Sequence, residues 1–219
     1  MGIIAIDPGH GGSTTIGGSS PNNATGPGGT LEKTLTLEVG LLTRDMLARN
    51  GHSVHMTRTT DVNIGLRDRA GIAMAARADA FVSIHFNGNV NTAVQGTETH
   101  VYLNTSGAAA AFTLATLVQR QVQGVTGYRD RGIFLSDLAV INPTNHYLST
   151  AACLLEISFL TDPSDETRLS STNYKRQLAE AIAVAVHDYV TARFALFDYT
   201  KMLRDVPNDY DDTNLGVQE

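Results

Sequence analysis

Residues 3–12 read IIAIDPGHGG, and this stretch decides the expected fold. Its first four residues are apolar and mostly β-branched, which is typical of a strand buried on both faces. Pro8 and Gly9 then stop the strand and turn the backbone. His10 follows the turn, where parallel sheets present ligands beyond the carboxyl ends of their strands. A lone histidine of this kind is more often a core residue than a ligand, so the site needs partners from elsewhere in the chain.

Two further apolar runs end in residues that can bind a metal or transfer a proton. Residues 80–88 read AFVSIHFNG and contain His85, and residues 151–157 read AACLLEI and contain Glu156. Predicted strands alternate with predicted helices, which indicates the α/β class: a single domain with a mostly parallel, twisted sheet and helices on both faces. Such a sheet brings His10, His85 and Glu156 to one edge.

The spacing of apolar residues predicts the remaining elements. Helices are expected over residues 31–50, 64–78, 107–123, 164–169 and 173–190, and strands over 52–57, 96–103 and 133–135. Thr30 is the expected N-cap of the first helix. Alternation places His52, His55 and His100 on solvated faces of their strands, and residues 129–132 are expected to form a turn.

Residues 11–30, which we call the flap, are dominated by Gly, Ser, Thr, Asn and Pro. A segment of this composition cannot build a core, so it is expected to be a loop beside the site or a disordered insertion. No Gly-Lys-Ser or Gly-Lys-Thr completes it, which excludes a phosphate-binding loop.

Glu32 completes a set of candidate metal ligands. It lies in the first turn of the helix predicted after the flap, where the helix dipole alone would favour a carboxylate, but where it can also be aimed at His10. Two imidazoles and one carboxylate, from His10, His85 and Glu32, suit one zinc ion with a fourth position open to water. Glu156 would then accept the water proton and pass it to a leaving amine. The pattern predicts hydrolysis of an amide without a covalent intermediate.

Composition and charge argue against several other classes of function. The 219 residues carry a net charge of −6 with no cluster of Lys and Arg, which argues against a nucleic-acid partner. No apolar run approaches the roughly 20 residues of a membrane span. The sequence starts on its first strand, so we expect no signal peptide in it, and the export route stays open. Cys153 is the only cysteine and reads as a buried hydrophobe rather than a catalytic thiol.

The pattern predicts two parts of unequal length. Residues 1–192 are expected to form the catalytic domain, and residues 193–219 a C-terminal extension that is acidic and flexible toward its end. We expect the tail beyond Asn208 to be dispensable for chemistry.

Several motifs, in this order over residues 2–190, resemble the zinc-dependent N-acetylmuramoyl-L-alanine amidases of the type 3 amidase family. They read DPGHGG at 7–12, LEK at 31–33, SIHFN at 83–87 and LEISFL at 155–160. The resemblance implies cleavage of the bond between the lactyl group of N-acetylmuramic acid and L-alanine in peptidoglycan. It also implies zinc binding by His10, Glu32 and His85, catalysis by Glu156, and action on the cell wall in the periplasm or outside the cell.

Two other functions remain compatible with the sequence. One is a zinc amidohydrolase or peptidase that acts on a smaller substrate with the same four residues. The other is a non-catalytic wall-binding module that keeps the fold, although the presence of all four candidate residues speaks against it. Oligomeric state, stem-peptide preference and a role as lysin, remodelling enzyme or toxin are left open by the sequence.

Overall fold

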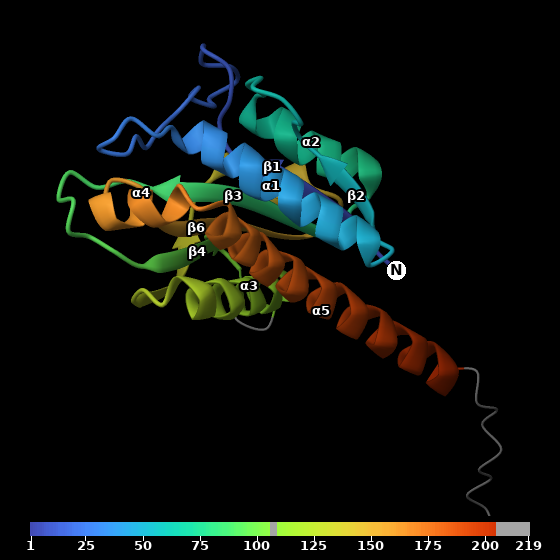
Figure 1. The fold of residues 1–219 in the computed structure, drawn as a ribbon. Coiled ribbons are helices and arrows are strands. Elements are labelled where there is room, and N and C mark those ends of the chain that lie inside the picture. The colour runs from blue at the N-terminus through green and yellow to red at the C-terminus, as the bar shows by residue number, and fades with distance from the viewer. Residues whose placement is uncertain (106–108, 205–219) are drawn as a thin grey trace, which may run out of the picture.

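The computed structural model describes residues 1–105 and 109–204, with side chains as far as residue 193 (Figure 1). Its strands are β1 (Ile3–Pro8), β2 (Ser53–Met56), β3 (Ala80–Asn87), β4 (Thr97–Tyr102), β5 (Asp130–Ser136) and β6 (Ala151–Phe159). The helices are α1 (Glu32–Arg49), α2 (Leu66–Ala76), α3 (Ala110–Thr126), α4 (Pro163–Leu169) and α5 (Thr172–Arg204), with short 3₁₀ turns η1 (Ala139–Ile141) and η2 (Pro143–Asn145).

The strands form one sheet in the order β2-β1-β3-β6-β4-β5. Neighbours pair in parallel except β4 and β6, which run antiparallel. The predicted α/β class and the mostly parallel sheet are therefore confirmed, with one reversed pairing. The parallel strands β1, β3 and β6 lie side by side at the centre, so residues from distant parts of the sequence meet at their carboxyl ends.

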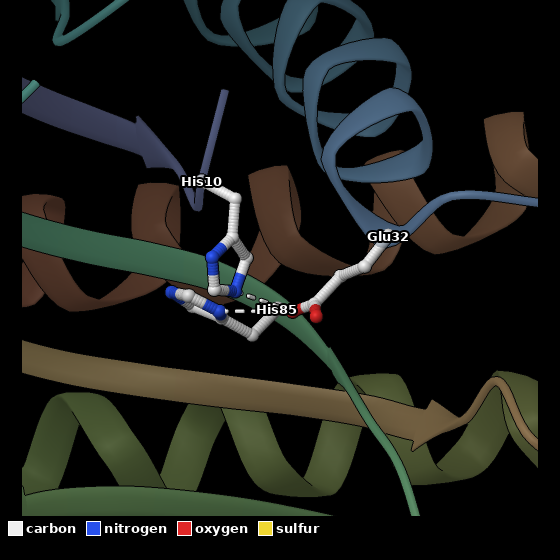
Figure 2. A group of neighbouring side chains, drawn as sticks. All are labelled: His10, Glu32 and His85. Carbon is white, nitrogen blue, oxygen red and sulfur yellow. Dashed lines mark hydrogen bonds and ion pairs between the residues drawn. The ribbon is translucent and has the colours of Figure 1, made fainter. Parts of the chain in front are cut away.

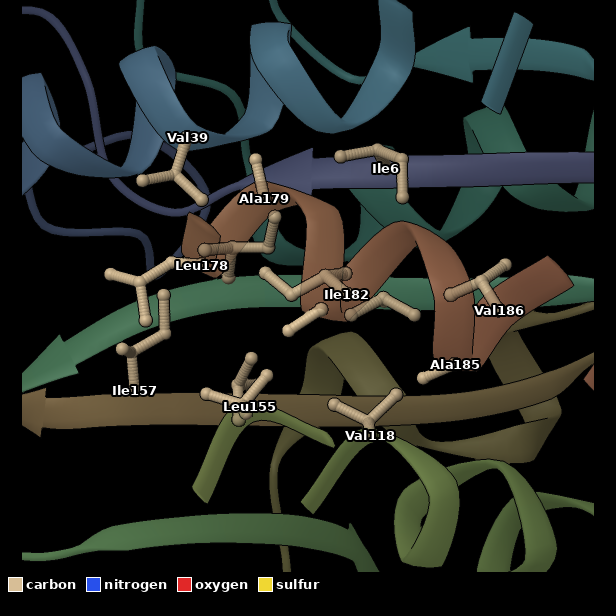
Figure 3. Packing of buried hydrophobic residues seen from close by; sticks show 14 of the residues in the cluster. Ile6, Val39, Val118, Leu155, Ile157, Leu178, Ala179, Ile182, Ala185 and Val186 are labelled. Carbon is tan, nitrogen blue, oxygen red and sulfur yellow. The ribbon is translucent and has the colours of Figure 1, made fainter. Parts of the chain in front are cut away.

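Helices cover both faces of the sheet. The larger core lies beneath α1, α3 and α5, where Val39, Val118 and Ile182 pack against Ile6 and Leu155 of the strands (Figure 3). Burial of each large aliphatic side chain contributes roughly 1.5–3 kcal/mol, which fixes the strands that carry the site.

The second face has a smaller cover, made by α2 and η1. There Phe81 and Leu154 of the sheet pack with Ala73, Val140 and Ile141. This cover does not extend to β5, where Phe134 remains exposed.

Four local predictions are wrong. Residues 130–132 belong to β5 rather than to a turn, because β4 pairs with them. Thr30 does not cap α1; the N-cap is Leu31, which has no side-chain capping bond. His52 is buried rather than solvated, and its Nε2 lies 3.0 Å from Nδ1 of His187 on α5. His100 is only partly exposed, with Nδ1 2.7 Å from the Ser136 hydroxyl. His55 is exposed and Cys153 is buried, as predicted.

The last helix runs further than its sequence pattern predicted. We expected it to end at residue 190, but α5 continues to Arg204, across the expected domain boundary at 192. Figure 1 shows its C-terminal turns extending beyond the sheet. The acidic end of the predicted extension, from residue 205, lies outside the described residues.

A membrane-spanning helix was not expected from the composition. Among the helices that the structure describes, none combines the length and the apolar content that a membrane span requires.

Candidate metal centre

Three elements bring His10, Glu32 and His85 together at the carboxyl ends of β1 and β3 (Figure 2). His10 follows β1, Glu32 opens α1 and His85 lies on β3. Oε1 of Glu32 is 3.2 Å from Nε2 of His10 and 3.0 Å from Nδ1 of His85. One ligand atom from each residue lies within 4.8 Å of the others, so the predicted ligand set is assembled in space.

The turn that presents His10 has an uncommon backbone. His10 adopts a φ of 60°, in the left-handed region that few non-glycine residues occupy. Gly9 is required beside it, because a Cβ at that position would overlap the His85 imidazole. The buried side chains of Arg58 and Arg69 hold the turn by donating to the backbone carbonyls of residues 8, 9 and 10.

Hydrogen bonding leaves one bare ring nitrogen of His10 facing Glu32. Nδ1 of His10 lies 3.0 Å from the carbonyl oxygen of Ser20, which can only accept, so Nδ1 carries the proton. Nε2 then presents a lone pair. It is buried and has no hydrogen-bond partner in the described part of the chain, although the Glu32 oxygen is close. A lone pair and a carboxylate that face each other fit a cation between them.

The charge of Glu32 is stabilised despite its burial. Burial raises the pKa of this carboxyl, but the neighbouring imidazoles of His10 and His85 outweigh it and lower the pKa to about 2. For His10, burial lowers the pKa, but the neighbouring carboxylate of Glu32 raises it above the usual value overall. One carboxylate with two imidazoles is a ligand set found in catalytic zinc sites.

Glu156 lies beside this group and outside it. Its Cα pairs with that of His85 across β3 and β6, so both side chains leave the same face of the sheet. Its Oε2 is buried and finds no hydrogen-bond partner within residues 1–105 and 109–193. Burial, followed by the charges of Glu32 and Glu98, raises the pKa of Glu156 well above its ordinary value. A carboxyl with a raised pKa next to a possible metal position is suited to proton transfer.

Comparison with known proteins supports the fold and the family. The family model described as N-acetylmuramoyl-L-alanine amidase matches residues 4–188. The chain belongs to this family. The resemblance seen in the motifs, and with it the expectation of an enzyme, is therefore confirmed.

Curated relatives and solved structures of the family agree. N-acetylmuramoyl-L-alanine amidase LytC of Bacillus subtilis is 34% identical over 82% of this chain and 34% of that protein. The amidase AmiC of Neisseria meningitidis is 30% identical over 86% of this chain and 52% of that protein. The chain thus spans about a third and about half of these two relatives. The amidase structure AmiC2 of Nostoc punctiforme superposes with a TM-score of 0.75 at 31% identity, covering 86% of this chain and 97% of that one.

Glu98 is a residue near the candidate centre that the sequence analysis left unassigned. It is the cross-strand partner of Glu156 on β4. Its carboxylate accepts from Nδ2 of Asn87 at 2.8 Å and from Nε of Arg131, and it lies 3.5 Å from His100. In the strand predicted over residues 96–103, alternation puts Glu98 on the same face as His100. The register that sets Glu98 against Glu156 depends on the reversed β4–β6 pairing, which no local pattern indicates.

The flap is an ordered loop rather than a disordered insertion. The backbone N–H of Ala24 donates to Oε2 of Glu32 at 2.8 Å, so the flap contacts the candidate ligand directly. On α4, Glu166 accepts from the backbone N–H groups of Gly28 at 2.6 Å and Thr30 at 3.0 Å. Nζ of Lys33 donates to the Gly12 carbonyl. Side chains of α4 and α1 therefore hold the flap against the centre.

His146 is not part of the centre. It is buried, its Nε2 lies 2.8 Å from the carbonyl oxygen of Val140, and its ring packs on Phe81 at a centroid distance of 4.7 Å.

A cavity of about 100 Å³ reaches His10 and His85 from the side of Val140 and Leu66.

Proposed function

We propose that the protein is a zinc-dependent N-acetylmuramoyl-L-alanine amidase of the cell wall, acting in the periplasm or outside the cell. Its substrate would be the amide between the lactyl group of N-acetylmuramic acid and L-alanine in peptidoglycan. One observation carries the proposal: His10, Glu32 and His85 converge, with Glu156 beside them, in a chain of the amidase family. The activities of longer relatives support it by analogy.

In this proposal His10, Glu32 and His85 hold one zinc ion. The bare Nε2 of His10, Nδ1 of His85 and Oε1 of Glu32 are the atoms that face a common point. When bound, zinc would lower the pKa of a water molecule to about 7 and polarise the amide carbonyl.

Glu156 supplies the proton transfers in the proposed reaction. As the water oxygen forms its bond to the lactyl carbonyl carbon, Glu156 accepts a water proton. It then donates that proton to the nitrogen of L-alanine as the carbon–nitrogen bond breaks. The products are a lactyl carboxyl group on the glycan and a peptide with a free amino terminus. The unpaired Oε2 of Glu156 is available for this proton, because no described side chain satisfies it.

Purified sacculi provide the test. The protein should release peptides that begin with L-alanine and leave intact glycan with free lactyl groups, as mass spectrometry of the digest would show. Removal of zinc with a chelator should stop the release, and added zinc should restore it. His10→Ala and His85→Ala should lose both zinc and activity, whereas His55→Ala, which removes an exposed imidazole on β2, should keep both.

The alternatives predict different products. Cleavage of small peptides or amides but not of sacculi would favour a zinc peptidase or amidohydrolase. Binding to sacculi without any released product would favour a wall-binding module. Activity that survives complete loss of zinc would overturn the proposal.

A further inference from the structure

A buried row of polar side chains extends from β1 to His85. Asp7 of β1 pairs with Ser83 of β3, and the Ser83 hydroxyl lies 2.7 Å from Oδ2 of Asp7. On its other side the same hydroxyl lies 3.2 Å from Nε2 of His85. Asp7 and Ser83 are both fully buried. The row therefore connects a buried carboxylate to the ring nitrogen of His85 that faces away from Glu32.

The partners of Asp7 show that it is ionised. Its Oδ1 accepts from Nη1 of Arg69 at 2.8 Å, in an ion pair that excludes solvent, and from the hydroxyl of Thr57 at 2.6 Å. An ionised carboxylate only accepts hydrogen bonds. The Ser83 hydroxyl must then donate to Asp7, since the opposite orientation would set two oxygen lone pairs against each other at 2.7 Å.

The direction of this first bond determines the second. With its proton directed at Asp7, the Ser83 oxygen can only accept from His85, so Nε2 of His85 carries the ring proton. Nδ1 is then the bare nitrogen, and it is the nitrogen that lies 3.0 Å from Glu32.

We propose that Asp7 and Ser83 are positioning residues that fix the tautomer of His85, so that its bare Nδ1 faces the metal position. This inference rests on the proposed function, because it assigns a role toward the zinc ion of that site. Neither residue touches the reacting atoms. The tautomer of His10 is fixed by a different group, the Ser20 carbonyl at its Nδ1, so the ring-nitrogen signals of the two histidines report separate hydrogen bonds.

Asp7→Asn is a sharp probe of this arrangement. The oxygen of the new amide would take the side of Arg69 and Thr57, both donors, which places the amide N–H₂ toward Ser83. Ser83 would then accept from the amide and donate to Nε2 of His85. The ring proton would move to Nδ1, into the metal position. An isosteric change that does not touch the ring would thus block zinc binding.

The experiment measures the zinc affinity of the wild type, Ser83→Ala, Asp7→Asn and the double variant. Each affinity is obtained by letting the protein compete with a chelator for zinc. Loss of an outer hydrogen bond to a metal-binding histidine typically costs 10- to 100-fold in metal affinity, and we expect this for Ser83→Ala. Asp7→Asn should lose more. The double variant should bind zinc about as well as Ser83→Ala, because without the hydroxyl the amide at position 7 cannot impose the wrong tautomer. Thr43→Val is the control, since it removes a buried hydroxyl that bonds only within α1.

Nuclear magnetic resonance of the ring nitrogens gives a readout besides activity. In the zinc-free wild type at mildly alkaline pH, His85 should carry its proton on Nε2; in Asp7→Asn it should carry it on Nδ1. If Asp7→Asn does not fold, Ser83→Ala decides through zinc affinity and loss of the protected Nε2–H signal.

Three results would overturn the inference. The first is that Ser83→Ala binds zinc as tightly as Thr43→Val, and the second is that His85 of the wild type carries its proton on Nδ1. The third is that the fold-loss of zinc affinity in the double variant equals the product of the losses in the two single variants. A wild-type protein that binds no zinc would instead contradict the proposed function, and the ring signals would still test the tautomer.

Discussion

Replacement of Glu156 by glutamine separates metal binding from proton transfer. Glutamine keeps the size and one carbonyl acceptor of glutamate, but it cannot take up a proton. Because Glu156 lies outside the group formed by His10, Glu32 and His85, zinc content should stay at the wild-type level. Hydrolysis of sacculi should fall by the contribution of a general base, roughly 100- to 10,000-fold, or about 3–5 kcal/mol of barrier.

The same variant should be more stable without zinc, and the sign follows from the pKa of Glu156. Burial, then Glu32 and Glu98, raise this pKa in the folded protein above its ordinary value of 4.5. At neutral pH the unfolded chain ionises Glu156 freely, whereas the folded protein opposes ionisation, so the wild-type carboxyl destabilises the fold. Glutamine removes this cost. The gain should shrink as the pH falls toward 4.5, by about 1.4 kcal/mol per pH unit for one proton.

Zinc content, wall hydrolysis and Tm should be measured on one preparation of Glu156→Gln. A gain in Tm together with a loss of activity cannot come from unfolding. Loss of zinc along with activity would make Glu156 a ligand. Retention of both zinc and full activity would refute its role as the base, and a lower Tm at neutral pH would refute the electrostatic argument.

Three further predictions concern stability. Glu166→Gln weakens the attachment of the flap to α4, because an amide oxygen accepts backbone N–H bonds less strongly than a carboxylate does. Limited proteolysis should therefore cut the flap faster in this variant. An unchanged cleavage rate would contradict the role of Glu166 in holding the flap. Asp162→Ala removes the N-cap of α4 and should cost about 0.5–2 kcal/mol in urea unfolding; no loss would show that α4 needs no cap. Burial, then His187, lower the pKa of His52, so the folded state binds fewer protons than the unfolded chain once the pH falls below 6.5. The free energy of unfolding should therefore decline below pH 6.5. The decline should be less steep in His187→Ala, where burial still lowers the pKa of His52. An equal decline in both proteins would exclude a contribution of His187 to this pKa.

The sequence was sufficient to predict the elements that carry the site. A buried β-branched run that ends at Pro and Gly leaves few options besides a central strand followed by a turn, which is how β1 presents His10. The same reasoning placed His85 on β3 and Glu156 on β6, because parallel strands align their carboxyl ends. Glu32 was predictable because it opens a helix that begins directly after the flap.

Long-range pairing explains what the sequence could not predict. Residues 130–132 resemble a turn, since Gly132 has a φ of 88°, yet they pair with β4 through a register shift. The burial of His52 depends on where α5 crosses the sheet, which its own strand does not reveal. Glu98 shows the same limit, because its place beside Glu156 requires an antiparallel pairing, and the prediction of a mostly parallel sheet does not say which strand is reversed.

The turn at His10 shows how the fold maintains an unfavourable backbone at the site. A non-glycine residue in the left-handed region costs about 1–2 kcal/mol, and the position persists only if its surroundings over-determine it. Arg58 and Arg69 do so, each nearly fully buried and each bonded to two carbonyls of the turn. Two buried guanidinium groups need a negative charge nearby, and the carboxylate of Asp7 supplies it through its ion pair with Arg69. The group that anchors the His10 turn is thus the one that orients Ser83 toward His85. Both histidines are thereby positioned by a single buried charge cluster, so their geometry is coupled even though 75 residues separate them in sequence.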